Sequence, residues 1–279
     1  MSVLEEHGIS DMLWVLLQVK DSVCALDSTC VEAISLLEEE ITRMPNSDET
    51  NVGVIQFRGS VLPIVDLRRL LGMQSRDQER RDFDEMLDLR KQDHIKWVDE
   101  LKRCAHDHAA FHLATDPHNC AFGKWYYKYQ PASRNLAFQM KKIEEPHRRL
   151  HESAVKVLSV KEDSEAGAAR VNEILNQETD AYKAQILRLL DEIQEAFDSS
   201  HHNMIVFVSD GTTTCGLQVD EVLAVEMLEP IEQNQQPSCV SYSHLVSQVA
   251  QRKIDQELIM LLNHRQLLST LPQGDQTPA

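Results

Sequence analysis

Short apolar runs separated by turn residues predict β-strands near the start of the chain. Residues 12–20 (MLWVLLQVK) and 23–34 (VCALDSTCVEAI) are two such runs, with Asp-Ser between them. Residues 52–67 (VGVIQFRGSVLPIVDL) contain two β-rich arms on either side of Arg58-Gly59-Ser60. This pattern predicts a β-hairpin with its turn at these three residues.

The same pattern returns near the end of the chain. Residues 203–228 (NMIVFVSDGTTTCGLQVDEVLAVEML) predict further strands, with a tight turn at Ser-Asp-Gly-Thr. Residues 257–271 (ELIMLLNHRQLLSTL) predict a last strand followed by a short helix. From Pro272 the sequence is polar, so we expect a flexible tail.

The central part of the chain has the periodicity of amphipathic helices. Apolar residues recur three to four positions apart in residues 82–114, 133–160 and 168–197, which predicts three long helices. Because proline lacks the backbone N–H donor, Pro146 either kinks the second helix or starts a new one.

These patterns predict an α+β protein in which one β domain carries an inserted all-α helical bundle. Two half-length β segments would each expose strand edges and would be poor independent domains, which favours a single split domain. An insertion is tolerated where the chain leaves and returns at a surface loop. The predicted boundaries are 1–74 for the first part of the β domain, 75–201 for the helical insertion, 202–272 for the second part and 273–279 for the tail.

Composition narrows the class of partner. The chain has 279 residues and a formal net charge of −17, which argues against nucleic acid and anionic membranes as partners. It contains no apolar run long enough to span a membrane, and its first residues lack the basic region of a signal peptide. The six cysteines form no C-x-x-C pair, so we expect reduced thiols and a cytoplasmic location.

Histidines concentrate in the helical part of the chain. His147 and His151 are four residues apart, so on a helix they share one face and can hold one metal ion. A tetrahedral zinc site needs about four nitrogen or sulfur ligands, which His94 and Cys120 would complete, and a thiolate favours Zn²⁺ over Mg²⁺ or Ca²⁺. Composition leaves the choice of ligands open, since a surface histidine commonly binds no metal. Other candidates are His108 and His112, which are also four apart, and His118, two residues from Cys120.

Three motifs in this region resemble the chemoreceptor zinc-binding (CZB) domain. They are DHIKWVDEL, HNCAFGKWYY and EEPHRRLHESA. That family is a helical bundle with a histidine on its first long helix, a cysteine in a Cys-x-Phe-Gly-x-Trp-like segment, and a His-x-x-x-His pair on a later helix. The resemblance implies zinc bound by His94, Cys120, His147 and His151, at intervals of 26, 27 and 4 residues. It implies that the other histidines, including His108, His112 and His118, do not bind the zinc ion or only contact its ligands.

The residues next to Cys120 indicate how its loop is held. Phe122, Trp125 and Tyr126 would pack beneath the loop, and Gly123 would permit a tight or positive-φ turn. A cysteine on a short segment can leave a metal without unfolding the bundle, and its zinc-bound thiolate is the form that oxidants attack. The compatible alternative is that these aromatic residues are simply part of the core.

The β segments resemble a second family, the bacterial chemotaxis coupling protein CheW. The main motif is VGVIQFRGSVLPIVDLRRLLG, and the later matches are MIVFVSDGTTTCGLQVDEVLAVEML and LIMLLNHRQLL. The resemblance implies two small, intertwined β-barrels, here split by the CZB-like bundle. The sequence departs from the family at CALD after the first turn and at SQVAQRKIDQEL before the last strand, which affects interface details but not the fold.

The second resemblance also implies a role. Proteins of the CheW family have no catalytic site and link chemoreceptors to the histidine kinase CheA. The family's receptor-binding arginine corresponds to Arg58, for which the alternative is a solvated turn arginine. We expect Pro63 and Asp66 to be structural, the proline at a sheet edge and the aspartate before a short helix.

Together these features favour a signalling adaptor over an enzyme. A zinc hydrolase needs an open metal position and a general base, but HRRLH and HAAFH lack the glutamate of His-Glu-x-x-His. We therefore expect an adaptor at receptor arrays whose helical module senses zinc or an oxidant such as hypochlorous acid. The alternative is a scaffold in which zinc is purely structural. The oligomeric state stays open, with a homodimer through the helical bundle as one option.

Overall fold

The chain divides into two compact units. One is formed by Met1–Arg76 and His202–Ala279, and the other by Asp77–His201. The computed structural model describes residues 8–36, 41–44, 50–131, 133–160, 164–199, 204–231 and 244–271. The flexible tail predicted for residues 273–279 lies outside the described residues.

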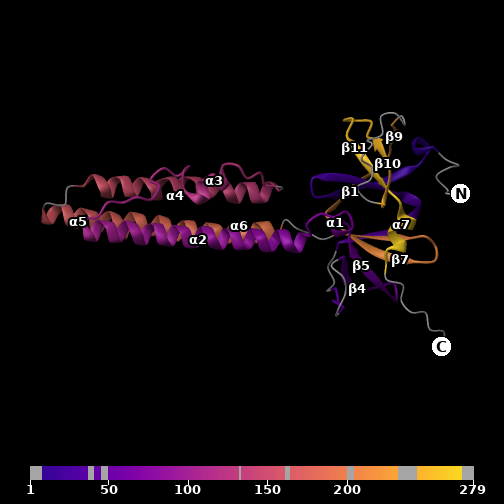
Figure 1. Cartoon of the computed structure of the whole chain (residues 1–279), viewed down its shortest axis with the longest axis horizontal. Coiled ribbons are helices and arrows are strands. Elements are labelled where there is room, and N and C mark those ends of the chain that lie inside the picture. Colours follow the sequence, from indigo (N-terminus) through magenta and orange to yellow (C-terminus); the bar gives the residue numbers. More distant parts are fainter. Residues whose placement is uncertain are drawn as a thin grey trace. The chain divides into compact units, whose positions relative to one another are not determined.

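The first unit contains two β-sheets, which together with the helical unit confirm the predicted α+β class (Figure 1). Sheet one has the strand order β8-β1-β2-β11-β10-β9, so two strands from the start of the chain lie between strands from its end. Strand β11 pairs with β2 in parallel, whereas the other pairings in this sheet are antiparallel. Its strands are β1 Leu13–Val19, β2 Ser22–Asp27, β8 Glu221–Met227, β9 Glu229–Pro230, β10 Val246–Gln251 and β11 Leu258–Leu262.

Sheet two has the strand order β3-β6-β7-β5-β4 and contains the predicted hairpin. In the β4–β5 register Phe57 lies opposite Ser60, which leaves a two-residue turn of Arg58 and Gly59. Both turn residues have positive φ, 49° and 86°, as the tightest hairpin turns require. The hairpin prediction is therefore confirmed. The strands are β3 Val31–Leu36, β4 Asn51–Phe57, β5 Ser60–Asp66, β6 Met204–Ser209 and β7 Thr214–Val219.

The predictions for Pro63 and Asp66, which follow this turn, are met to different degrees. Pro63 does not lie on an edge strand, because β5 lies between β7 and β4. Pairing with β7 begins only at Ile64, so Pro63 sits where β5 has a neighbour on one side. Asp66 does precede a short helix, α1 (Leu67–Leu70), and its Oδ1 accepts hydrogen bonds from the backbone N–H groups of Arg68 and Arg69.

A buried carboxylate joins three parts of this unit. Asp220, between β7 and β8, accepts hydrogen bonds from the Arg68 guanidinium, with the shortest N–O distance 2.5 Å, and from the backbone N–H of Lys20. Its Oδ1 is also 3.2 Å from Nε of Arg76. The three side chains are 6 to 12% exposed, so these charges compensate one another away from water.

Replacing Asp220 by alanine is expected to destabilise the β unit by about 3 kcal/mol, because it removes the charged partner of a buried guanidinium. Hydrogen exchange of the β7 amides measures this local free energy. Asp255→Ala is the matched control, since the Asp255 side chain is 47% exposed and pairs with Arg252 at the surface. Equal protection of β7 in both variants would show that the Asp220 cluster contributes little.

The second unit is a helical bundle around one apolar core (Figure 1). Its core combines α2 residues such as Leu87 and Leu101 with residues of α4 and α6. Ion pairs link α2 to α6, with Lys91 Nζ 2.8 Å from Asp191 and Lys102 Nζ 2.6 Å from Asp180. Within the described part of the chain, no helix combines the length and apolar character needed to cross a bilayer. The elements are α2 Arg76–Asp107, α3 Ala121–Tyr126, α4 Arg134–Ser159, α5 Glu165–Glu173, the π-helical segment η4 Ile174–Thr179 and α6 Asp180–Ser199.

Two details of the predicted helices need correction. The first helix ends at Asp107, not at residue 114, because His108 adopts a positive φ of 51° and the Ala109 N–H turns back to the Cys104 carbonyl. The apolar residues beyond it pack the following segment onto α2, as Phe111 does against Trp97. Helix α4 continues through Pro146 as one element, so no new helix starts there.

Candidate metal centre

Helix α4 supplies two buried imidazoles from one face. His147 and His151 lie one turn apart, and each residue is only 1% exposed. Their Nε2 atoms are 3.2 Å apart. Two ring nitrogens at this distance, in a pocket shielded from water, are arranged as a pair of metal ligands would be.

Cys120 brings a sulfur to the same point from another element. It is the N-cap residue of α3, and its Sγ lies 3.2 Å from Nε2 of His147. The ligand atoms of Cys120, His147 and His151 all lie within 4.8 Å of one another. The structure therefore brings together three of the four predicted ligands, from residues that are distant in sequence.

His94, the fourth predicted ligand, borders this group without joining it. It is buried in α2, and its ring centroid lies 5.3 Å from that of His147. Its Nε2 is buried and has no hydrogen-bond partner among the described residues. A buried polar nitrogen without a partner is uncommon and costs free energy, so this atom fits a site completed by a bound cation.

Backbone carbonyls orient two of the rings. Nδ1 of His94 is 2.7 Å from the Arg90 carbonyl, and Nδ1 of His151 is 3.0 Å from the Ala114 carbonyl. A carbonyl oxygen only accepts hydrogen bonds, so each Nδ1 carries the proton and each Nε2 keeps its lone pair. Trp97 Nε1 also donates to the Ala114 carbonyl, at 2.9 Å, which ties this segment to α2.

The electrostatics of the site suit a zinc ion. Burial lowers the pKa of His94, lowers that of His147 to about 2 and lowers that of His151 to about 4. The rings are therefore neutral at pH 7 and able to donate lone pairs. Burial raises the pKa of the Cys120 thiol, so a cation is needed to favour its thiolate. A neutral imidazole set with one sulfur is the donor chemistry of tetrahedral zinc sites.

The aromatic residues around Cys120 pack as the sequence suggested. Phe122 is 1% exposed, and its ring makes edge contacts with His94 and His147, with centroids 5.4 and 4.9 Å apart. Trp125 and Tyr126 pack against the same core. The expectation of a tight or positive-φ turn at Gly123 is wrong. Gly123 lies inside α3, and a Cβ there would be 1.8 Å from the Pro117 carbonyl oxygen.

Gly123→Ala is therefore expected to push the Pro117–Cys120 segment outward and to destabilise the bundle by about 1–3 kcal/mol, because an added methyl overlaps backbone. Zinc affinity should fall with it, since the Cys120 Sγ is displaced. Thermal unfolding and a chelator competition measure the two effects. Gly167→Ala, in the first turn of α5, is the control and should change neither, because Gly167 is only partly buried and lies outside the Cys120 segment; identical results for the two variants would contradict the packing argument.

The remaining histidines lie outside the centre. His106, His108, His112 and His118 are exposed. His118 stacks on Tyr127 and pairs with Asp116, and α2 ends before the His108/His112 spacing could form a helical pair. Sequence reasoning missed Trp97, although it lies three residues after His94 on the same helix face. It also missed the Arg90 and Ala114 carbonyls, for which side-chain identity gives no signal.

Comparisons with known proteins find two family matches in the first 158 residues of the chain. Residues 13–95 match the model of the CheW-like domain, and residues 94–158 match the model of the chemoreceptor zinc-binding domain. No curated protein matches the chain. The solved structures similar to it include the crystal structure of the scaffolding protein TtCheW from Thermoanaerobacter tengcongensis, with 13% identity and a TM-score of 0.39 over 94% of this chain and 90% of that chain. The chain thus combines a CheW-like domain with a chemoreceptor zinc-binding domain.

Proposed function

We propose that this protein is a non-enzymatic chemotaxis adaptor, which couples chemoreceptors to the histidine kinase CheA and carries a zinc-responsive module. The observation that carries the proposal is the convergence of Cys120, His147 and His151 inside a domain that matches the zinc-binding family. We assign zinc to these three residues and His94. A site closed by four protein ligands leaves no open position for hydrolysis.

The β unit supports the coupling part of this proposal. The CheW-like match ends at residue 95, but the unit is completed by strands from the end of the chain. Strand β8 pairs with β1 over their length, and β11 pairs with β2. We therefore assign residues 202–272 to the same CheW-like domain, with residues 75–201 as an insertion. This arrangement lets a metal-dependent change in the bundle reach both halves of the coupling domain.

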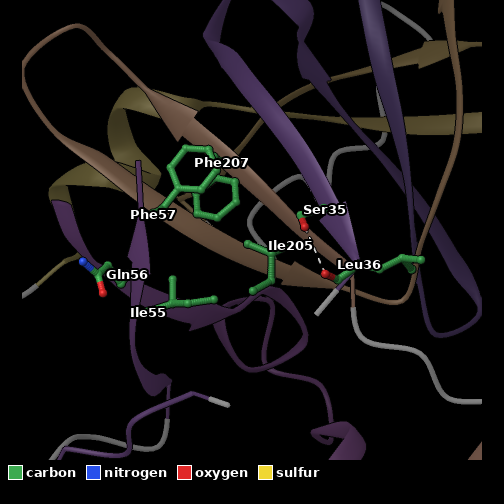
Figure 2. A pocket seen from close by; sticks show the side chains of 7 residues that line it. All are labelled: Ser35, Leu36, Ile55, Gln56, Phe57, Ile205 and Phe207. Carbon is green, nitrogen blue, oxygen red and sulfur yellow. Dashed lines mark hydrogen bonds between the residues drawn. The ribbon is translucent and has the colours of Figure 1, made fainter. Parts of the chain in front are cut away.

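The turn at Arg58 supports the partner-binding part. Arg58 is exposed, and its guanidinium carbon lies 4.9 Å from the centroid of the Phe57 ring. Phe57 stacks on Phe207 in a pocket of about 150 Å³ on sheet two, lined by polar as well as apolar side chains and shown in Figure 2. The guanidinium therefore stands next to a recess with room for one side chain. Arginine and aromatic residues are enriched where protein partners bind.

Arg58→Glu is expected to weaken receptor binding about tenfold or more, because it reverses the charge at this surface without touching the core. A pull-down or titration calorimetry with the receptor signalling domain measures the change. Lys253→Glu is the matched control, since Lys253 is also exposed but lies on the loop between β10 and β11. If both variants bind the receptor like the original protein, the proposed role of Arg58 is wrong.

A zinc titration with two partner readouts tests the adaptor function itself. The full chain is freed of metal with a chelator and then titrated with zinc, while binding to CheA and to a receptor fragment is followed. Binding to both partners supports the adaptor, and its absence at every zinc level contradicts it. A change in partner binding that follows zinc occupancy supports sensing. Constant binding, with zinc changing only the thermal stability of the bundle, would assign the metal a purely structural role.

A further inference from the structure

Two distances between the proposed ligand atoms are already close to those of a zinc site. In a tetrahedral site with Zn–N near 2.0 Å and Zn–S near 2.3 Å, ligand atoms lie roughly 3.3–3.7 Å apart. The Cys120–His147 and His147–His151 distances are both 3.2 Å. His94 lies outside the group of atoms within 4.8 Å of one another. The four side chains are therefore not equivalent.

The His94 ring is held by its own helix. Its Nδ1 bonds to the Arg90 carbonyl one turn earlier in α2, and its ring packs between Phe122 and His147. Rotating the ring toward the other ligands would break this hydrogen bond. To complete a tetrahedral set, the His94 Nε2 has to come closer to the three grouped atoms.

A cleft reaches the site on the side of His94. It has a volume of about 400 Å³, and its walls include His94, Cys120 and His151 together with Trp97, Leu113 and Phe122. Leu113 is 43% exposed, which places the mouth of the cleft at the surface. An ion or a small ligand can therefore approach the three grouped atoms from the side where His94 stands apart.

We infer that Cys120, His147 and His151 capture the metal first and that His94 binds last and closes the site. This inference rests on the proposed zinc function and adds an order of binding. The unpartnered Nε2 of His94 gains a ligand bond in this step, which favours closure.

Cobalt(II) used as a probe in place of zinc tests this order, because its absorption reports both the thiolate bond and the coordination geometry. His94→Ala and His94→Gln are expected to bind one cobalt per chain with the thiolate band retained, and with an affinity about 10- to 100-fold lower. Added imidazole should alter the visible bands of His94→Ala, since the cleft admits it to the place that His94 leaves. His147→Ala should lose the thiolate band at the same cobalt concentration.

Two outcomes would overturn the inference while leaving the zinc site in place. One is loss of the thiolate band in both His94 variants at concentrations where the original protein is saturated, as in His147→Ala. The other is unchanged affinity and no response to imidazole in His94→Ala. Circular dichroism of each variant confirms that the bundle is folded. Failure of the original protein to bind cobalt or zinc would instead reject the proposed metal centre itself.

Discussion

His147→Ala is expected to lower the zinc affinity by about 1,000-fold or more, equivalent to about 4 kcal/mol. His147 is the central member of the group, because its Nε2 lies 3.2 Å from both Cys120 Sγ and His151 Nε2. Its removal leaves Cys120 Sγ and His151 Nε2 without the nitrogen that lies next to both of them. Structural zinc sites bind with roughly 10–16 kcal/mol in total, so the loss of one central ligand accounts for a change of this size.

Elemental analysis of the purified protein and competition with a chromogenic chelator measure the effect. The full-length protein should carry one zinc per chain, and His147→Ala should carry almost none after dialysis. His118→Ala is the matched control, because His118 lies two residues from Cys120 but is exposed and stacks on Tyr127. Unchanged zinc content in His147→Ala, or an equal loss in His118→Ala, would show that the ligands have been misassigned.

Treatment with hypochlorous acid is expected to release nearly all of the bound zinc and to change binding to CheA. Zinc, when bound, lowers the pKa of the Cys120 thiol and opposes the burial that raises it. The thiolate attacks hypochlorous acid, forming an S–O bond as the O–Cl bond breaks; sulfur loses two electrons, and the products are a sulfenic acid and chloride. A sulfenic acid is a poor zinc ligand, so the Cys120 segment separates from the His147/His151 helix.

Zinc release and CheA binding should be followed in the same samples. Cys120→Ser should release no additional zinc on oxidation, because serine is a poor ligand and does not form a sulfenic acid. Cys104→Ser is the matched control: Cys104 is the other cysteine of the bundle, is 1% exposed, and bonds to Glu100 and the Ala110 carbonyl away from the group. It should respond like the original protein. Zinc release without a change in CheA binding would keep the metal site and reject redox signalling.

The sequence by itself determined most of the strands, the hairpin and the candidate metal-binding residue types, but not β9 or β10. The β4–β5 turn follows from a glycine between two runs of β-branched residues, since only a two-residue turn with positive φ joins them closely. Spacing indicated that His147 and His151 share one helix face, and the resemblance of the surrounding motifs to the chemoreceptor zinc-binding family implied the full ligand set. These are local signals, fixed by residues that are close in the chain.

Only the tertiary structure decided where the first long helix ends and how the metal-binding side chains come together. Apolar periodicity continues past Asp107, but the segment after it folds back so that Phe111 packs on Trp97. The spacing of apolar residues is the same for a continued helix and for a segment that folds back. Gly123 is required by the approach of the Pro117 carbonyl, not by its own φ angle. His94 lies outside the group formed by Cys120, His147 and His151, and its ring bonds to the Arg90 carbonyl of its own helix. Such contacts depend on backbone atoms and on packing between elements, which side-chain identity does not encode.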